Sequence, residues 1–184
     1  MKELSLNILD ISKNSVKAGA SLTEILLEET DQKLTLKIID DGCGMKKEMV
    51  DSVTDPFTTT RTTRPVGMGI PLLKLAAEMT DGSFNIESRH FEEYPENHGT
   101  EVTAIFNKNH IDFTPLGDVI ASITTLIQGS PNTDFLFKHT LPNGEVSVDT
   151  RELREQLGDV PLDTFEVILW IEEYLKEQYE ALNN

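Results

Sequence analysis

The stretch Asp40-Asp-Gly-Cys-Gly-Met45 places two carboxylates and two glycines directly after an apolar run that predicts a β-strand. Gly42 and Gly44 permit backbone conformations closed to other residues, and they carry no Cβ atom that would obstruct a ligand. A carboxylate only accepts hydrogen bonds. A buried Asp40 therefore suits the exocyclic amine of adenine and disfavours guanine, which presents a carbonyl oxygen at that position. An ordinary turn after the strand is the alternative that this stretch leaves open.

A polar stripe precedes this stretch in a segment that predicts a helix. Asn7, Asp10, Asn14 and Lys17 recur at spacings of three and four residues, which places them on one helical face. The carboxylate of Asp10 and the amide of Asn14 could serve as a base and a metal ligand, and Lys17 could reach a phosphate. A solvated helix face is the alternative interpretation of the same spacing.

A second glycine cluster, Gly67-Met-Gly-Ile70, opens another predicted helix. Gly67 and Gly69 would lie where free N–H groups and the helix dipole favour an anion. The segment upstream, Thr58–Arg64, supplies hydroxyl groups and the guanidinium of Arg61, which suit a lid over a polyphosphate. A flexible surface loop is the alternative, and the chain contains no Walker-type phosphate loop.

Apolar periodicity predicts the elements that must position these residues. In the first part of the chain we expect helices over residues 3–18, 46–53 and 70–79, and strands over 22–27, 34–39, 83–89 and 100–106. After residue 107 we expect a helix over 118–127, a hairpin of strands 134–141 and 145–149, and two helices announced by the capping-box patterns Asp149–Glu152 and Asp163–Glu166. The predicted domains are residues 1–109 and 110–184.

Composition limits the functions to consider. The 184 residues include 32 acidic and 16 basic side chains, a net charge of −16, which argues against binding nucleic acid or an anionic membrane surface. The one cysteine, Cys43, excludes an internal disulfide. No apolar run approaches the ~20 residues that a bilayer requires, and the N-terminus lacks the apolar core of a signal peptide. We therefore expect a cytoplasmic protein.

Taken in order, these motifs resemble the Bergerat-fold ATPases, a superfamily that holds gyrase-type topoisomerases, the large heat-shock chaperone, MutL proteins, histidine kinases and anti-sigma-factor kinases. The segments that carry the resemblance are LDISKNSVKAGAS, DDGCGM, DPFTTTR, GMGIPLLK and Gly99-Thr100, which together span residues 3–106. The resemblance implies an α+β fold: a two-layer α/β sandwich in which helices cover one face of a mixed, mostly antiparallel sheet. Residues 110–184 would form a small α+β extension outside it.

The resemblance also implies ATP and Mg²⁺ as cofactors. It implies that Asn14 holds Mg²⁺, which keeps few protein ligands beside phosphate oxygens and waters, and that Asp40 holds the adenine amine. The supporting residues it implies are Gly42 and Gly44 beside the base and sugar, Thr100 on the base side, Gly67 and Gly69 at the phosphates, and Lys17 and Arg61 as further phosphate contacts.

Two positions depart from the pattern of the superfamily. Asp10 stands where several ATP-hydrolysing or phosphorylating members carry Glu, and there it would orient or deprotonate the attacking group. Its side chain is one methylene shorter. Pro71 stands where histidine kinases usually have a third glycine, and proline is tolerated in the first turn of a helix.

The use of ATP stays open between an enzyme and a switch. The first hypothesis is a stand-alone protein kinase similar to the anti-sigma Ser/Thr kinases, acting on an unidentified protein partner. The alternative is a non-enzymatic or slow-ATPase switch that binds a partner through residues 110–184. A sensor histidine kinase is disfavoured, because none of the four histidines lies in an amphipathic helix beside an acid. The last predicted helix, from about residue 164, would serve as core or as the seam of a homodimer.

Overall fold

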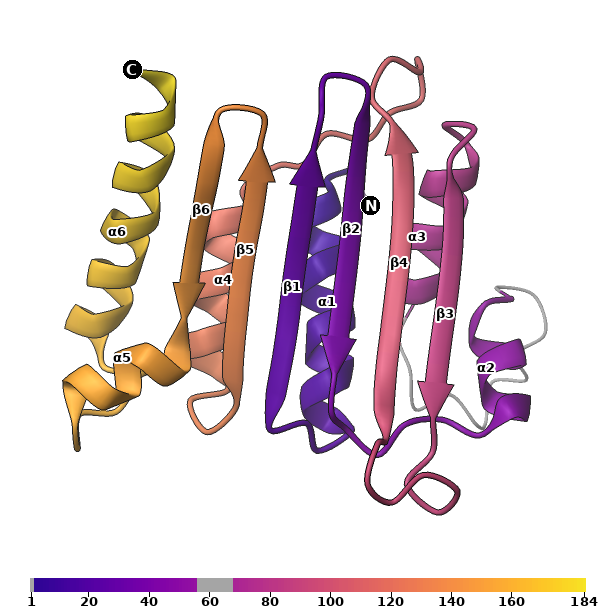
Figure 1. Ribbon diagram of the computed structural model, residues 1–184, viewed down its shortest axis with the longest axis horizontal. Coiled ribbons are helices and arrows are strands. Elements are labelled where there is room, and N and C mark those ends of the chain that lie inside the picture. Colours follow the sequence, from indigo (N-terminus) through magenta and orange to yellow (C-terminus); the bar gives the residue numbers. More distant parts are fainter. Residues whose placement is uncertain (1, 56–67) are drawn as a thin grey trace.

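The structure is a computed structural model that describes residues 2–55 and 68–184. Figure 1 shows its helices and strands. The first part of the chain forms α1 (Leu4–Lys17), β1 (Leu22–Glu29), β2 (Lys33–Asp40), α2 (Lys47–Val53), α3 (Gly69–Glu78), β3 (Ser83–Arg89) and β4 (Gly99–Asn107). The remainder forms α4 (Val119–Gly129), β5 (Asp134–Leu141), β6 (Gly144–Asp149), α5 (Thr150–Leu157) and α6 (Phe165–Asn183). Every predicted element is present, with its ends within a few residues of those expected.

The described strands form one six-stranded sheet in the order β3-β4-β2-β1-β5-β6. Neighbouring strands run antiparallel except for β1 and β5, which are parallel. In Figure 1, α1, α3 and α4 all lie behind the sheet. This arrangement confirms the predicted fold class, a mixed and mostly antiparallel sheet with helices on one face.

Alternation along the strands explains why the helices gather on one side. In β2, Leu34, Leu36 and Ile38 are buried while the residues between them are partly exposed. Successive side chains of a strand point to opposite faces, so one face of the sheet is apolar and needs a cover. Helix α1 supplies it with Leu4, Ile8 and Ile11, which recur at helical spacing and are almost fully buried.

The segment after residue 110 extends this same sheet. Strand β5 pairs with β1 from Leu22↔Asp134 to Glu28↔Thr140. Its side chains Phe135, Phe137 and His139 are all buried, so their alternation reflects packing of the sheet. Helix α4 packs against α1, and α6 packs against α4 and β6. The division into domains at residue 109 stays a prediction, and the two segments share a sheet and a hydrophobic core.

The two helices announced by capping-box patterns begin differently. Asp149 caps α5, because its carboxylate accepts a hydrogen bond from the backbone N–H of Arg151 at 2.9 Å. Helix α6 starts one residue later than the pattern indicates, with Thr164 at the N-cap position. The Thr164 hydroxyl donates to the carbonyl of Pro161 and makes no cap. Burial of Ile171 and Leu175 in the helix that packs against α4 and β6 therefore accounts for α6 better than capping does.

Within the described residues, no helix combines the length and the apolar character needed to cross a membrane.

Phe137→Ala tests whether the C-terminal strands belong to the common core. Phe137 is fully buried in the strand that pairs with β1. We expect the substitution to lower the free energy of unfolding by about 3–5 kcal/mol, through lost transfer energy and a cavity. Phe91→Ala is the control, because Phe91 is 47% exposed, and it should cost less than about 1 kcal/mol. Urea unfolding measures both, and equal losses in the two variants would contradict the prediction.

Candidate functional site

A cavity of about 510 Å³ lies where β2 ends, beside α1 and α2. Predicted site residues in its wall are Asn14, Lys17, Asp40, Gly44 and Thr100. The remaining wall is largely apolar and includes Ile11, Ile38, Met45, Met49 and Val102. Residues far apart in the sequence thus meet in one cavity, because Asp40 of β2 pairs directly with Thr100 of β4.

Asp40 is the fixed polar group of this cavity. Its Oδ2 accepts a hydrogen bond from Ser15 Oγ at 2.7 Å, and its Oδ1 accepts one from the backbone N–H of Gly42 at 3.0 Å. Burial raises the pKa of this carboxyl above its ordinary value, and the bonds from Ser15, Gly42 and the Thr100 backbone oppose the rise without cancelling it. The result is an oriented acceptor in a mostly apolar hollow.

Asp41, the second carboxylate, has a different task. It accepts hydrogen bonds from the backbone N–H groups of Ser21 (2.7 Å) and Leu22 (2.9 Å), and from the Ser21 hydroxyl. Burial raises its pKa, but these donors outweigh that effect and hold the pKa below its usual range. Asp41 therefore ties the end of β2 to the start of β1, while Asp40 faces the cavity.

Neighbouring segments of the chain lie too close to Gly42 and Gly44 for either position to carry a Cβ atom. Gly44 has a φ of +70°, and a Cβ atom there would lie 2.0 Å from the carbonyl oxygen of Arg89. A Cβ atom at Gly42 would lie 2.9 Å from Cβ of Ala18. The sequence suggested that both glycines make room for a ligand. The structure adds that a Cβ atom at either position would collide with neighbouring atoms of the protein itself, the Ala18 side chain at Gly42 and the Arg89 backbone at Gly44.

The polar stripe of α1 turns inward, so the solvated-face interpretation is wrong for most of it. Asn7 is only 2% exposed, and its Nδ2 donates to the carbonyl of Gly69 in a long bond of 3.5 Å. Asn14 is half-buried, and its Nδ2 is a buried atom without a hydrogen-bond partner in the part of the chain that the structure describes. Lys17, at the end of the helix, is exposed and lines the cavity.

Asp10 lies against the start of α3 instead of in the cavity wall. A Cβ atom at Gly69 would lie 2.4 Å from Asp10 Oδ2, so only glycine allows the carboxylate to approach this closely. The first N–H groups of a helix lack partners inside it, and α3 begins at Gly69. The structure therefore brings the acid of α1 to the end of the second glycine cluster. Arg61 and Gly67 lie outside the described residues.

Two contacts of the site were not predicted from the sequence. Ser15, which bonds Asp40, is 3% exposed and lies four residues after buried Ile11, so helical spacing could have indicated it. A ring nitrogen of His98, Nδ1, pairs with the carbonyl oxygen of Gly42 at 2.5 Å. No sequence signal announces that contact, because it joins residues 56 positions apart.

The family described as "Histidine kinase-, DNA gyrase B-, and HSP90-like ATPase" matches residues 2–110. The chain is 34% identical over 103 residues to sporulation kinase D of Bacillus subtilis, covering 56% of this chain and 19% of that protein. It is 30% identical over 101 residues to the sensor histidine kinase YvrG of the same organism, covering 52% of this chain and 16% of that protein. The chain thus spans less than a fifth of the length of either relative.

Among solved structures, the Aquifex aeolicus MutL ATPase domain complexed with ADP shares the fold, with a TM-score of 0.55 at 16% identity. The match covers 85% of this chain and 68% of that one. Because 85% of the chain reaches beyond residue 110, part of the C-terminal segment is included in the shared fold.

Asp40→Asn tests the buried charge. A carboxyl whose pKa is raised in the folded state stabilises the fold when protonated, and that contribution is lost as pH rises through the folded pKa. We therefore expect the parent to gain stability relative to Asp40→Asn as pH falls from neutral through the raised pKa toward the ordinary value of 3.8. Urea unfolding across that pH range measures the difference in free energy of unfolding between the parent and the variant. The contributions of the other carboxyls cancel in this difference, because both proteins contain them. A parent that instead loses stability relative to the variant would contradict the raised pKa.

Proposed function

The chain belongs to the histidine kinase-, DNA gyrase B- and HSP90-like ATPase family, and we propose that it binds ATP with Mg²⁺ in the cavity at the end of β2. We propose further that it uses ATP as a protein kinase or slow ATPase that acts on a partner protein. The observation that carries the proposal is the orientation of Asp40: both of its oxygens are held by hydrogen bonds in a cavity with apolar walls.

The base would occupy the apolar part of the cavity. A planar purine fits between walls such as Ile38, Met49 and Val102, and its burial there is favourable. Asp40 accepts the exocyclic amine of adenine, whereas guanine would oppose two acceptors and leave both unsatisfied. Thr100 supports the base side next to Asp40, and Gly42 and Gly44 form the turn against which base and sugar would lie.

The phosphates would extend toward α1 and the start of α3. Asn14 would offer Mg²⁺ its side-chain oxygen, the ligand type that Mg²⁺ prefers. Its Nδ2, which has no hydrogen-bond partner among the described residues, would be free to donate to a phosphate oxygen. When bound, Mg²⁺ neutralises phosphate charge. Lys17 lines the cavity within the same helix, and the N–H groups at Gly69 favour an anion. Gly67 and Arg61 would complete the phosphate contacts.

Asp10 is our candidate for the reacting end of the site. It approaches Gly69, where the phosphates would end. In a transfer to a partner's Ser or Thr, the hydroxyl oxygen bonds to the γ-phosphorus while the bond to ADP breaks, and Asp10 accepts the hydroxyl proton. In a slow ATPase the same carboxylate would orient water. Similarity to histidine kinases over about half of the chain supports the use of ATP.

Asp40→Asn should weaken ATP binding at least about tenfold, because the side-chain amide would present an N–H donor where the adenine amine needs an acceptor. Calorimetry with ATP and Mg²⁺ measures the affinity, and GTP should bind the parent at least about tenfold more weakly than ATP. Asp81→Asn is the matched control: this exposed Asp already has a φ of +55°, which Asn tolerates. An absence of heat with the parent, or unchanged affinity in Asp40→Asn, would refute the nucleotide site.

Asp10→Asn should separate chemistry from binding. We expect ADP release, or labelling of a partner by radiolabelled ATP, to fall about 100-fold or more, since a positioned base contributes about that much. ATP affinity should change less than about threefold, because Asp10 does not line the cavity. Asp112→Asn, a charge change on the connection after β4, controls for the lost charge. A parent that binds ATP but never turns it over would favour the nucleotide-dependent switch instead.

A further inference from the structure

Exposed apolar side chains gather on the outward side of α6 and on the connection that precedes it. We call this the α5–α6 face, and it consists of Val160, Phe165, Leu169, Trp170 and Tyr174. Their exposed fractions run from 39% for Tyr174 to 66% for Phe165. The spacing of four residues, from Phe165 to Leu169 and from Trp170 to Tyr174, aligns them in two pairs along the helix. At 3.6 residues per turn the two pairs lie about 140° apart around α6, with Glu166 between them. A monomeric protein rarely concentrates such side chains without a binding role.

A groove runs beside this face. It has a volume of about 250 Å³ and lies between α5 and α6, with Leu153, Leu157 and Val167 in its wall. Trp170 forms its rim and stacks on Tyr174, with ring centroids 4.9 Å apart and planes 10° from parallel. The stacked pair holds the indole in place, so the groove is preformed for one bulky apolar side chain.

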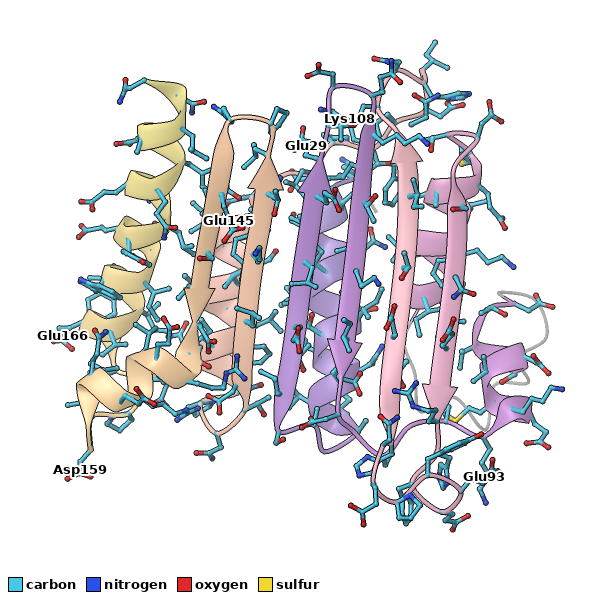
Figure 2. The ribbon with its side chains drawn as sticks, viewed as in Figure 1. Glu29, Glu93, Lys108, Glu145, Asp159 and Glu166 are labelled. Atoms are coloured by element: carbon cyan, nitrogen blue, oxygen red, sulfur yellow. The ribbon has the colours of Figure 1, made fainter. Side chains whose placement is uncertain are left out.

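The surroundings of the face are acidic. Residues 150–184 contain nine Asp and Glu side chains and three Lys and Arg side chains. The three cations form ion pairs: Arg151 with Asp149, Arg154 with Asp134, and Lys176 with Glu172. Only one of these pairs neutralises an acid of the segment itself. Figure 2 labels Asp159 and Glu166 at the same outer corner of the molecule, and Glu166 also lines the groove.

We propose that the α5–α6 face docks an amphipathic helical segment of a partner protein, with lysines or arginines flanking its apolar side chains. One bulky apolar residue of that segment occupies the groove, the remainder covers Phe165 and Leu169, and its cations meet the acidic rim. A second copy of this chain fits less well, because it carries the same net charge of −16. An anionic membrane is repelled for the same reason.

The docking surface lies away from the nucleotide cavity. In Figure 1, α6 flanks β6 at one edge of the sheet, whereas β2, which ends at the cavity, is an interior strand. The inference therefore goes beyond ATP binding and does not depend on it. Loss of peptide docking with intact ATP binding, or the reverse, would distinguish failure of one proposal from failure of the other.

The single tryptophan of the chain, Trp170, supplies a local readout. The probe is a synthetic peptide of leucine and lysine, about 18 residues or five helical turns long, whose leucines fall on one helical face. We expect a saturable change in Trp170 emission, with affinity falling as salt rises. Two control peptides should not bind: one with the same composition in scrambled order, and one with glutamate in place of lysine.

Matched variants separate this face from the rest of the surface. Phe165→Ala combined with Tyr174→Ala should raise the dissociation constant at least about tenfold. Tyr94→Ala, which removes an aromatic on the β3–β4 connection whose exposure lies between those of Phe165 and Tyr174, should leave the dissociation constant within about twofold. Glu166→Lys should weaken binding several-fold, whereas Glu93→Lys, at the far end of the molecule in Figure 2, should have little effect.

Four results would overturn the inference. The first is that the amphipathic peptide produces no saturable change in Trp170 emission, and the second is that its scrambled version binds equally well. The third is that the Phe165→Ala and Tyr174→Ala variant binds the peptide like the parent, and the fourth is that Glu93→Lys weakens binding as much as Glu166→Lys does. Sedimentation that shows a dimer of the parent, lost in the Phe165→Ala and Tyr174→Ala variant, would assign the face to a second copy of the chain.

Discussion

A buried carboxylate at the end of a central strand is the interaction on which the site depends. Placing Asp40 in a mostly apolar hollow costs free energy, as its raised pKa indicates. The fold offsets part of that cost with hydrogen bonds from the hydroxyl of Ser15 on α1, the N–H of Gly42 on the following turn and the backbone of Thr100 on β4. These bonds hold both oxygens of Asp40 in place at the wall of the cavity.

The same constraint accounts for the local sequence around it. Asp41 anchors the turn to β1, so that Asp40 does not also have to close the turn. Gly44 lets that turn pass the carbonyl of Arg89, and His98 holds it from the β3–β4 connection. Helix α1 then contributes to both ends of the site, because Asn14 lines the cavity while Asp10 approaches Gly69.

The opposite end of the sheet is built as a closed polar junction. His139 is 2% exposed, and its ring pairs with Glu29 at 3.1 Å and with the Tyr179 hydroxyl at 2.7 Å. Burial lowers the pKa of His139, with Glu29 opposing the shift. Lys108 pairs with Glu29 at 2.6 Å, and Figure 2 shows these two at the same end of the sheet. The network joins β1, β5, α6 and the chain after β4, so the C-terminal segment is attached by polar bonds as well as by strand pairing.

What the sequence alone determined was local: apolar periods of two and about 3.6, together with the capping-box patterns before α5 and α6, located the helices and strands of the described residues, and the order of short motifs identified the superfamily. These features depend only on residues that are close together in the chain, which is why they could be predicted from the sequence. The tertiary structure decided which groups meet. It placed β5 beside β1 and turned Asn7 inward toward α3. It also showed that a Cβ atom at Gly42 or Gly44 would collide with a neighbouring segment of the chain. It also placed Ser15 and His98 beside the glycine turn, because such contacts depend on packing between segments far apart in the sequence and leave no local pattern.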